Sequence, residues 1–390
     1  MPSPFRVQAA NALLSLRAPV LLFIAIFSIR VAGIGLATAT GFHPFAGGQV
    51  DGHARQAEII ANGFVAGELA LERWDSTFER WGLLLSVFWL LPGPSLLYAQ
   101  LAMAAIGAAG IYNVYVIARH YHSHRAGLIA IAPLAVFPSY VFMHGVLQRE
   151  ALVLFSLTAA YRLLFVRGDL LQPLARYTLA AVFLLIPAYL RTFNAPVLGV
   201  VAVVGVLAAV WHVDRLSREL KLAGTALSAL VGIPLVAAVA RYTVANPADV
   251  VQYLADVRLR RARGRAVYLP DVAPTNLIEL VGFSWIAALY FLFSPFPWMV
   301  ETTSDFVIML ESLVTVGFAV LALRGFKILA ARHPIGAIVL LSWLLVYAVL
   351  FGLGTANFGT GLRHRQAAVW VIYLVGAVGV ARTIEHRGVT

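Results

Sequence analysis

The sequence predicts an all-α protein, a polytopic transmembrane bundle of about ten helices. Of its 390 residues, 61% are hydrophobic and only 12% are charged. The mean hydropathy is +0.84, and the apolar residues form runs of about 17–25 residues, the length that crosses a bilayer. Soluble domains carry about 25% charged residues. The composition therefore excludes a soluble globular protein.

Ten apolar runs are interpreted as spans. The first follows a short basic N-terminal segment and is too long for a signal-peptide core, so we expect it to be retained. The predicted spans are Ala18–Thr38, Leu96–Ala118, Ala126–Met143, Ala151–Phe165, Tyr177–Leu190, Pro196–Trp211, Ala223–Thr243, Phe306–Leu323, Pro334–Phe351 and Gln366–Ala381.

One further run, Asn276–Trp298, is also long enough to span. Counting it as a span would move Arg324, Lys327 and Arg332 to the outer side and break the positive-inside rule. We therefore predict that it is a re-entrant or interfacial segment, interrupted by its two prolines.

With a cytoplasmic N-terminus, every inside connection of this topology is basic. Three pieces lie outside: a first extracytoplasmic loop at 39–95 with its own helices, a second at 244–305 that includes the re-entrant segment, and a short turn at 352–365. No internal repeat or linker divides the chain, which predicts one integral domain over 1–390. Multi-pass insertion in the inner (plasma) membrane follows.

The charge is +11, from 29 Lys and Arg against 18 Asp and Glu. In a membrane protein basic residues first serve topology, so nucleic acid is not an expected partner. About half of them, however, fall on the outer side. Five of these arginines lie within 258–265, and they repel one another unless an anion gathers them. This cluster predicts an anionic ligand; a solvated loop that touches membrane lipids is the alternative.

Arg30 and Glu311 are ionisable residues in the interior of predicted spans, away from the span ends. Such residues are costly in hydrocarbon and are usually paired. We expect Glu311 to pair with a neighbouring helix rather than to take part in chemistry.

Asp51 opens a stretch with helical spacing in the first outer loop. Asp51, Arg55 and Glu58 share one face of this short helix, which Asn62-Gly63 is expected to end. A carboxylate at the water–lipid boundary can act as a general base or as a metal ligand. The alternative role is the N-cap of the helix.

Glu150 is a second acid on the same side, held at the boundary by the short turn before 151–165. An ionisable group at that depth favours a functional role; neutralisation by Arg149 and capping of the next helix are the alternatives. Other basic residues reach the same level of the membrane, at the outer ends of the fifth and tenth spans: Arg191, Arg363, His364 and Arg365. Acids beside arginines there form a site for a phosphate leaving group.

Several motifs of the first 190 residues or so carry a family resemblance. They are the stretch from Asp51 to Gly63, the turn Gly93-Pro94-Ser95, the tripeptide Phe137-Pro138-Ser139, and Arg149-Glu150 about a hundred residues after Asp51. This pattern resembles the polyprenyl-phosphate-dependent glycosyltransferases of GT-C type, which include protein O-mannosyltransferases and the aminoarabinose transferases of lipid A. The chain departs from that pattern in its glutamate after the third span, where aspartate is more usual, and in its single first-loop acid.

The resemblance implies a GT-C-like fold and an inverting transferase that moves a sugar from a polyprenyl-phosphate donor to a glycan, lipid or protein acceptor at the extracytoplasmic face. It implies that Asp51 and Glu150 are the catalytic acids and candidate ligands of a divalent cation, Mg²⁺ or Mn²⁺. The expected phosphate-binding residues are Arg55, Arg149, Arg191, Arg258, Arg260, Arg261, Arg263, Arg363, His364 and Arg365.

Three other functions stay open. A polysaccharide polymerase or ligase using a polyprenyl-diphosphate-linked glycan would depend more on arginines and on His364 than on Asp51. A transporter or flippase of lipid-linked anions would show symmetric halves and ionisable groups near mid-span. A structural membrane subunit would leave the outer arginines unexplained.

Overall fold

The computed structural model describes residues 4–41, 49–68, 76–91, 93, 95–166, 171–212, 217–218, 221–222 and 250–387. The side chains at 4–17, 49–51, 77, 250 and 386–387 lie outside this description. Within it the chain forms helices joined by short connections, and its one β contact is an isolated bridge between Val267 and Asn357.

The helices of the first half are α1 (Pro4–Thr40), α2 (Gln49–Ala66), α3 (Thr77–Leu90), α4 (Leu96–Tyr121), α5 (His124–Val136), α6 (Pro138–His144), α7 (Glu150–Phe165), α8 (Pro173–Leu190) and α9 (Asn194–Trp211). Those of the second half are α11 (Val250–Arg261), α12 (Leu277–Phe293), the short 3₁₀ helix η3 (Pro297–Met299), α13 (Thr303–Arg332), α14 (Pro334–Leu353) and α15 (Phe358–Arg387).

Seven described helices are long and apolar enough to cross a membrane, or eight if the bent pair α5–α6 counts as one span. The predicted span 151–165 is α7, which has only 16 residues. The predicted span 223–243 lies outside the described residues. The prediction of an all-α, multi-pass bundle is confirmed, while the single domain and the sidedness of its loops remain predictions.

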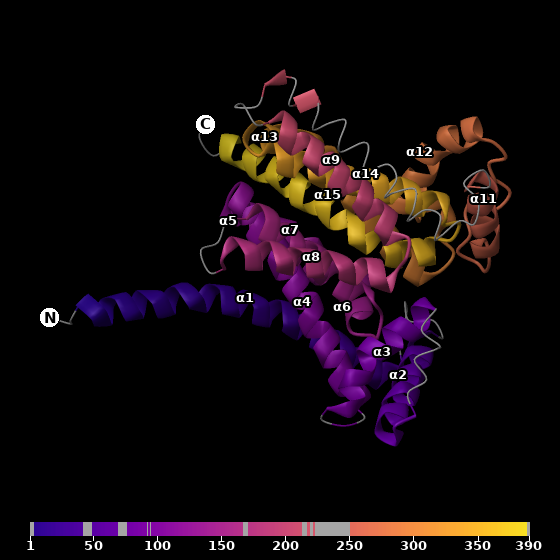
Figure 1. The fold of residues 1–390 in the computed structure, drawn as a ribbon, viewed down its shortest axis with the longest axis horizontal. Coiled ribbons are helices and arrows are strands. Elements are labelled where there is room, and N and C mark those ends of the chain that lie inside the picture. Colours follow the sequence, from indigo (N-terminus) through magenta and orange to yellow (C-terminus); the bar gives the residue numbers. More distant parts are fainter. Residues whose placement is uncertain are drawn as a thin grey trace.

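The bundle is built around α15, with α4, α5, α7, α13 and α14 packed against it. Every residue from Ala367 to Val375 is at most 5% exposed. Figure 1 shows α1 projecting from the rest of the molecule, and the pair α2–α3 at the opposite end from the two termini. The predicted loop helices of 39–95 are therefore a packed pair beside one end of the bundle, in which the first turns of α2 lie against the start of α3.

The third span is broken between α5 and α6, which meet at an angle of 68°. Pro138 has no N–H, so the carbonyl of Leu134 loses its helical donor. Arg30 Nη2 donates to this carbonyl at 2.9 Å. At the start of α6 the backbone N–H of Ser139 donates to Glu311 Oε1 at 3.0 Å. The two mid-span ionisable residues thus provide hydrogen-bond partners for the backbone groups that the break leaves unpaired. The expected pairing of Glu311 with another helix is confirmed.

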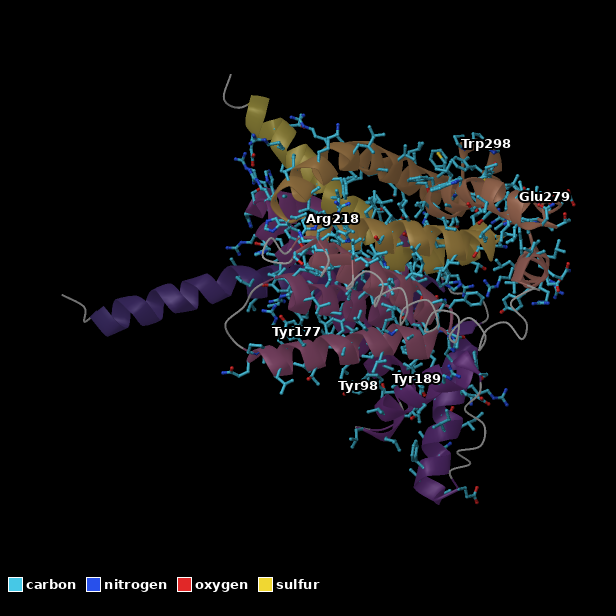
Figure 2. The ribbon with its side chains drawn as sticks, turned by 45° about the horizontal axis from the view of Figure 1, so that its top comes forward. Tyr98, Tyr177, Tyr189, Arg218, Glu279 and Trp298 are labelled. Atoms are coloured by element: carbon cyan, nitrogen blue, oxygen red, sulfur yellow. The ribbon has the colours of Figure 1, made fainter. Side chains whose placement is uncertain are left out.

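Helix α12 stops inside the bundle. It ends at Phe293, and the carbonyl of Ser294 accepts hydrogen bonds from Arg365 at 2.5 Å and from Ser312 at 3.2 Å. Ser312 is the tenth residue of α13 and Arg365 is the eighth residue of α15, so both donors lie well inside their helices. The segment after α12 turns back toward the start of α13. Trp298 in this segment is 73% exposed. It lies at the same end of the bundle as Glu279, near the start of α12 (Figure 2). This is the geometry of the re-entrant segment predicted for 276–298, whose position relative to a membrane remains a prediction.

Helix α2 is longer than the sequence indicated. It covers Gln49–Ala66, so the predicted end at Asn62-Gly63 is wrong. Gly67, with φ of +72°, adopts the left-handed conformation in which helices commonly end. The buried face of α2 packs on α3, so tertiary contact outweighs the weak helix propensity of Gly63.

We predict that Glu311→Leu destabilises the fold, whereas Glu311→Gln does not. Leucine leaves the Ser139 N–H buried without an acceptor, at a cost of about 1–3 kcal/mol, but glutamine keeps an oxygen in place. Thermal unfolding in detergent micelles measures the difference. Equal melting temperatures of the leucine and glutamine variants would contradict the assigned role.

Candidate functional site

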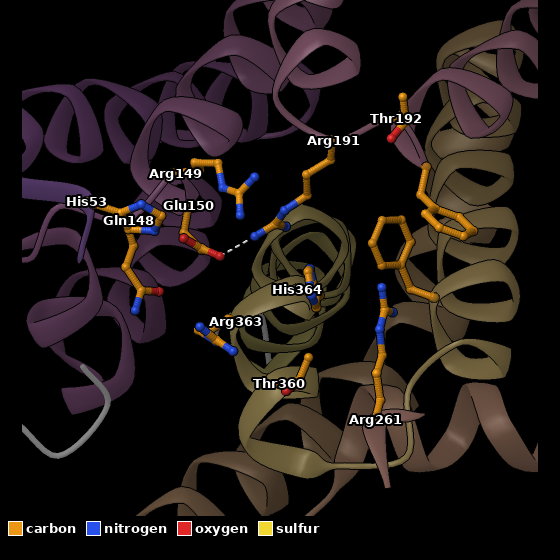
Figure 3. Close-up of a pocket in the computed structure, with 12 residues that line it drawn as sticks. His53, Gln148, Arg149, Glu150, Arg191, Thr192, Arg261, Thr360, Arg363 and His364 are labelled. Atoms are coloured by element: carbon orange, nitrogen blue, oxygen red, sulfur yellow. Dashed lines mark hydrogen bonds and ion pairs between the residues drawn. The ribbon is translucent and has the colours of Figure 1, made fainter. Parts of the chain in front are cut away.

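A cavity of about 420 Å³ opens where α7 begins, α8 ends and α15 begins. Figure 3 shows its polar side chains converging from α2, the α6–α7 and α8–α9 connections, α11 and α15. The lining residues are His53, Gln148, Arg149, Glu150, Arg191, Thr192, Phe193, Arg261, Phe351, Thr360, Arg363 and His364.

An ion pair between Glu150 and Arg191 crosses this pocket. Arg191 Nη2 donates to Glu150 Oε1, and both residues are less than one tenth exposed. Glu150 is the first residue of α7, where the helix dipole favours a carboxylate. Arg191 follows the last residue of α8 in an extended conformation that ends that helix. The pair therefore ties the start of one helix to the end of the next.

Arg149 and Arg261 enter the pocket as partners of helix carbonyls. Arg149 Nη1 donates to the carbonyl of Leu190, the last residue of α8, at 2.9 Å. Arg261 Nη1 donates to the carbonyl of Gly354, just after α14, also at 2.9 Å. These carbonyls carry the negative end of a helix dipole, which attracts cations. Two arginines are thereby fixed at the rim of the cavity.

Arginine dominates the electrostatics of the pocket. Four arginines line it, with Glu150 as the one carboxylate among the described lining residues, which leaves three positive charges. Arg191, Arg363 and Arg149 all lie close enough to Glu150 to act on its charge. Burial, with the nearby Arg191 adding to it, lowers the pKa of Arg261. Guanidinium groups that crowd in this way bind phosphate-like anions by charge-assisted hydrogen bonds.

Two histidines supply uncharged polar atoms. His53 is 3% exposed and its ring lies 4.5 Å from that of Phe78. Burial and the charge of Arg149 lower the pKa of His53 to about 4, against the opposing effect of Glu150, so its imidazole is neutral at pH 7. The buried Nδ1 atoms of His53 and His364 have no hydrogen-bond partner among the described residues.

Six of the predicted site residues line the pocket together: Arg149, Glu150, Arg191, Arg261, Arg363 and His364. Arg149 does not neutralise Glu150 alone, because Arg191 makes the direct ion pair. Asp51 lies in the first turn of α2, two residues before His53, and its side chain is outside the described residues. The catalytic role of Asp51 remains a prediction. Arg55, on the same helix, is exposed and is not among the residues that line the pocket.

The predicted arginine cluster of 258–265 is divided by the structure. Arg258, 1% exposed, donates to the carbonyls of Val272, Thr355, Tyr268 and Leu269. Arg265 pairs with Asp305 and Glu301, two acids that are distant in sequence. Arg260 and Arg263 are exposed. No anion is needed to gather these five side chains, and only Arg261 reaches the pocket.

Arg365 also lies outside the pocket. It donates to the carbonyls of Leu292 and Ser294 and to Ser312, so it holds the end of α12. His364 and Arg363, which precede it on α15, face the cavity instead.

Sequence reasoning missed half of the lining residues: His53, Gln148, Thr192, Phe193, Phe351 and Thr360. A signal existed for His53, because it lies four and eight residues before Ala57 and Ala61, on the buried face of α2. The aromatic residues carry no such local signal.

The described residues do not fit a divalent cation at Glu150. No group of three potential metal ligands exists among them, and the Glu150 carboxylate is surrounded by arginines. A cation there would be repelled by the guanidinium groups. We therefore derive no chemical step through a metal.

No protein-family model matches the chain, and no curated protein matches it. A solved structure, the oligosaccharyltransferase of Archaeoglobus fulgidus in the apo form, is similar over 95% of this chain, with a TM-score of 0.48 and 15% sequence identity. The match covers 52% of that protein, so this chain spans about half of its length.

We predict that His53 makes the fold less stable in mild acid. Its pKa is about 4 in the folded protein against 6.5 for an ordinary histidine, so the unfolded chain binds a proton first as the pH falls. The free energy of unfolding then decreases by about 2 kcal/mol between pH 7 and pH 5. Thermal unfolding of the parent and of His53→Gln at both pH values measures this, and the glutamine variant should lose less stability. The same loss in both proteins would contradict the burial of a neutral His53.

Proposed function

We propose that this protein is a membrane glycosyltransferase that moves a sugar from a polyprenyl-phosphate donor to an acceptor at the extracytoplasmic face. One observation supports this above the others: four arginines from four separate elements meet in one cavity at an end of an apolar helical bundle. The anionic head of a lipid-linked sugar is a ligand of matching charge and location. The sequence resemblance to polyprenyl-phosphate-dependent transferases supports the same substrate class.

In the proposed reaction, the bond between the sugar C1 and the phosphate oxygen breaks while the acceptor oxygen or nitrogen attacks C1 from the opposite face. The electron pair of the broken bond stays on the phosphate. Arg149, Arg191, Arg261 and Arg363 stabilise this developing charge. The attack inverts the configuration at C1.

The acids have different proposed roles. Asp51, two residues before His53 on α2, is proposed to remove the proton from the acceptor hydroxyl or amine as general base. Glu150 orients Arg191 through their ion pair and offsets part of the repulsion among the arginines. The neutral His53 donates a hydrogen bond to the acceptor or the sugar.

The positive-inside distribution of arginine supports the orientation of the site. With the N-terminus in the cytoplasm, the ends of α8 and α14 and the start of α15 face outward, in the inner (plasma) membrane. A glycan, lipid or protein acceptor would approach from that side.

We predict that Arg363→Ala and Arg261→Ala each weaken the binding of a polyprenyl phosphate by about 10-fold to 150-fold. Each substitution removes charge-assisted hydrogen bonds to the phosphate, worth about 1.5–3 kcal/mol. Binding of a radiolabelled polyprenyl phosphate to protein in detergent measures the loss, with the corresponding polyprenol as the phosphate-free reference.

Arg260→Ala is the matched control, because Arg260 neighbours Arg261 on α11 but is exposed. It should bind like the parent. If Arg261→Ala and Arg260→Ala bound polyprenyl phosphate equally well, the pocket would not be the phosphate site.

We further predict that Asp51→Asn lowers the rate of sugar transfer by about 10²-fold to 10⁴-fold, the usual contribution of a general base, while leaving donor binding unchanged. Glu150→Gln should also slow transfer, because Arg191 loses its charged partner. Transfer is measured with purified, folded protein in proteoliposomes. Variants that transfer sugar as fast as the parent would refute the proposed roles.

A polymerase or ligase that uses a polyprenyl-diphosphate-linked glycan is the second candidate. The observation that favours it is the position of His364 inside the pocket, where its buried Nδ1 has no hydrogen-bond partner among the described residues. The transfer assay separates the two functions: a large loss for Arg363→Ala with little loss for Asp51→Ala favours the diphosphate enzyme.

A further inference from the structure

A second cavity lies away from the arginine pocket and shares no residue with it. Its volume is about 550 Å³, and α12, α13, α14 and α15 form its walls. Leu292 and Phe293 close one end, and Lys327 lies at the other. Apart from Lys327, every described residue that lines it is apolar.

This groove follows from the early end of α12. That helix stops at Phe293, whereas α13, α14 and α15 continue past it, as Figure 1 shows. From Ala319 to Lys327 the groove follows α13 for eight residues, about 12 Å at the rise of an α-helix. Half of the hydrocarbon thickness of a bilayer is about 15 Å. The groove therefore matches the depth of one leaflet.

The charge at the open end is positive. Lys327 is exposed and has no ion pair among the described residues. Arg324 and Arg332 lie on the same end of α13. The nearby acid on α15, Glu385, already pairs with His122 and Arg382. This end of the bundle is the one that the arginine distribution predicts to be cytoplasmic, where anionic lipids attract basic side chains.

We propose that this groove binds one anionic phospholipid, with an acyl chain under the end of α12 and the phosphate at Lys327. The apolar walls select a hydrocarbon chain, and the single ammonium group at the rim selects an anionic head group. The bound lipid fills the space that a full-length span at α12 would occupy, and so packs against the last residues of α12, Leu292 and Phe293. This proposal is independent of the glycosyl-transfer reaction.

Native mass spectrometry of the full chain tests the head-group preference. Protein in detergent is titrated with phosphatidylglycerol or with phosphatidylcholine of the same acyl chains, and the complexes are then released from the micelles in the mass spectrometer. We expect one phosphatidylglycerol to be retained at collision energies that remove phosphatidylcholine. Lys327→Ala should weaken phosphatidylglycerol binding about fivefold, the usual contribution of one basic residue at a membrane surface.

Lys221→Ala is the matched control, because Lys221 donates to the Trp211 carbonyl and lies outside the groove. It should retain phosphatidylglycerol like the parent. Equal retention of the two lipids by the parent, or equal binding by the Lys327 and Lys221 variants, would overturn the proposal.

A second pair of variants tests the acyl chain. Ala322→Trp places a large ring in the groove, whereas Val320→Trp places it on a surface that is 62% exposed. We expect only the first to lose the retained lipid. If the Ala322 variant fails to fold, the lysine pair decides the question; if it folds and keeps the lipid, the acyl chain does not occupy the groove.

Discussion

The fold depends on one constraint: backbone carbonyls that lose their helical donor inside an apolar bundle need another partner. Arginine supplies that partner repeatedly, because its guanidinium carries five donors in a fixed plane. Arg30 satisfies the carbonyl exposed by Pro138 in the broken third span. Arg365 holds the end of α12, and Arg258 binds four carbonyls of the α11–α12 and α14–α15 connections. These three buried arginines therefore serve the fold.

The same constraint fixes the location of the pocket. Helix ends expose unpaired carbonyls and concentrate dipole charge, and α8 and α14 both end beside the start of α7. Arg149 and Arg261 bind the terminal carbonyls there, while Glu150 takes the position at which α7 favours an anion. Each guanidinium can make further hydrogen bonds besides the one to a carbonyl. A ligand site for an anion thus arises where structural arginines from different helix ends meet.

Hydropathy was sufficient to predict the all-α, multi-pass bundle, because that prediction depends on summed apolar length, whereas the sidedness from the positive-inside rule remains a prediction. The roles of single arginines were not predictable. Arg258 and Arg261 are one helical turn apart, yet one binds four carbonyls and the other lines the pocket. The carbonyls of 268–272 and 354–355 decide this, and they approach only in the folded chain. His53 was different, since its spacing from Ala57 already placed it on the buried face of α2.

The carboxylate within an arginine pocket has a physical explanation. Four guanidinium groups in partly apolar surroundings repel one another, and this repulsion raises the free energy of the unliganded protein. Glu150 offsets one of these charges and holds Arg191 through a direct ion pair, so the pocket can form before a ligand arrives. The described lining residues still carry four arginines against one carboxylate, and a phosphate would neutralise part of that charge. Glu150 therefore makes the empty site stable enough to fold while leaving it attractive to an anion.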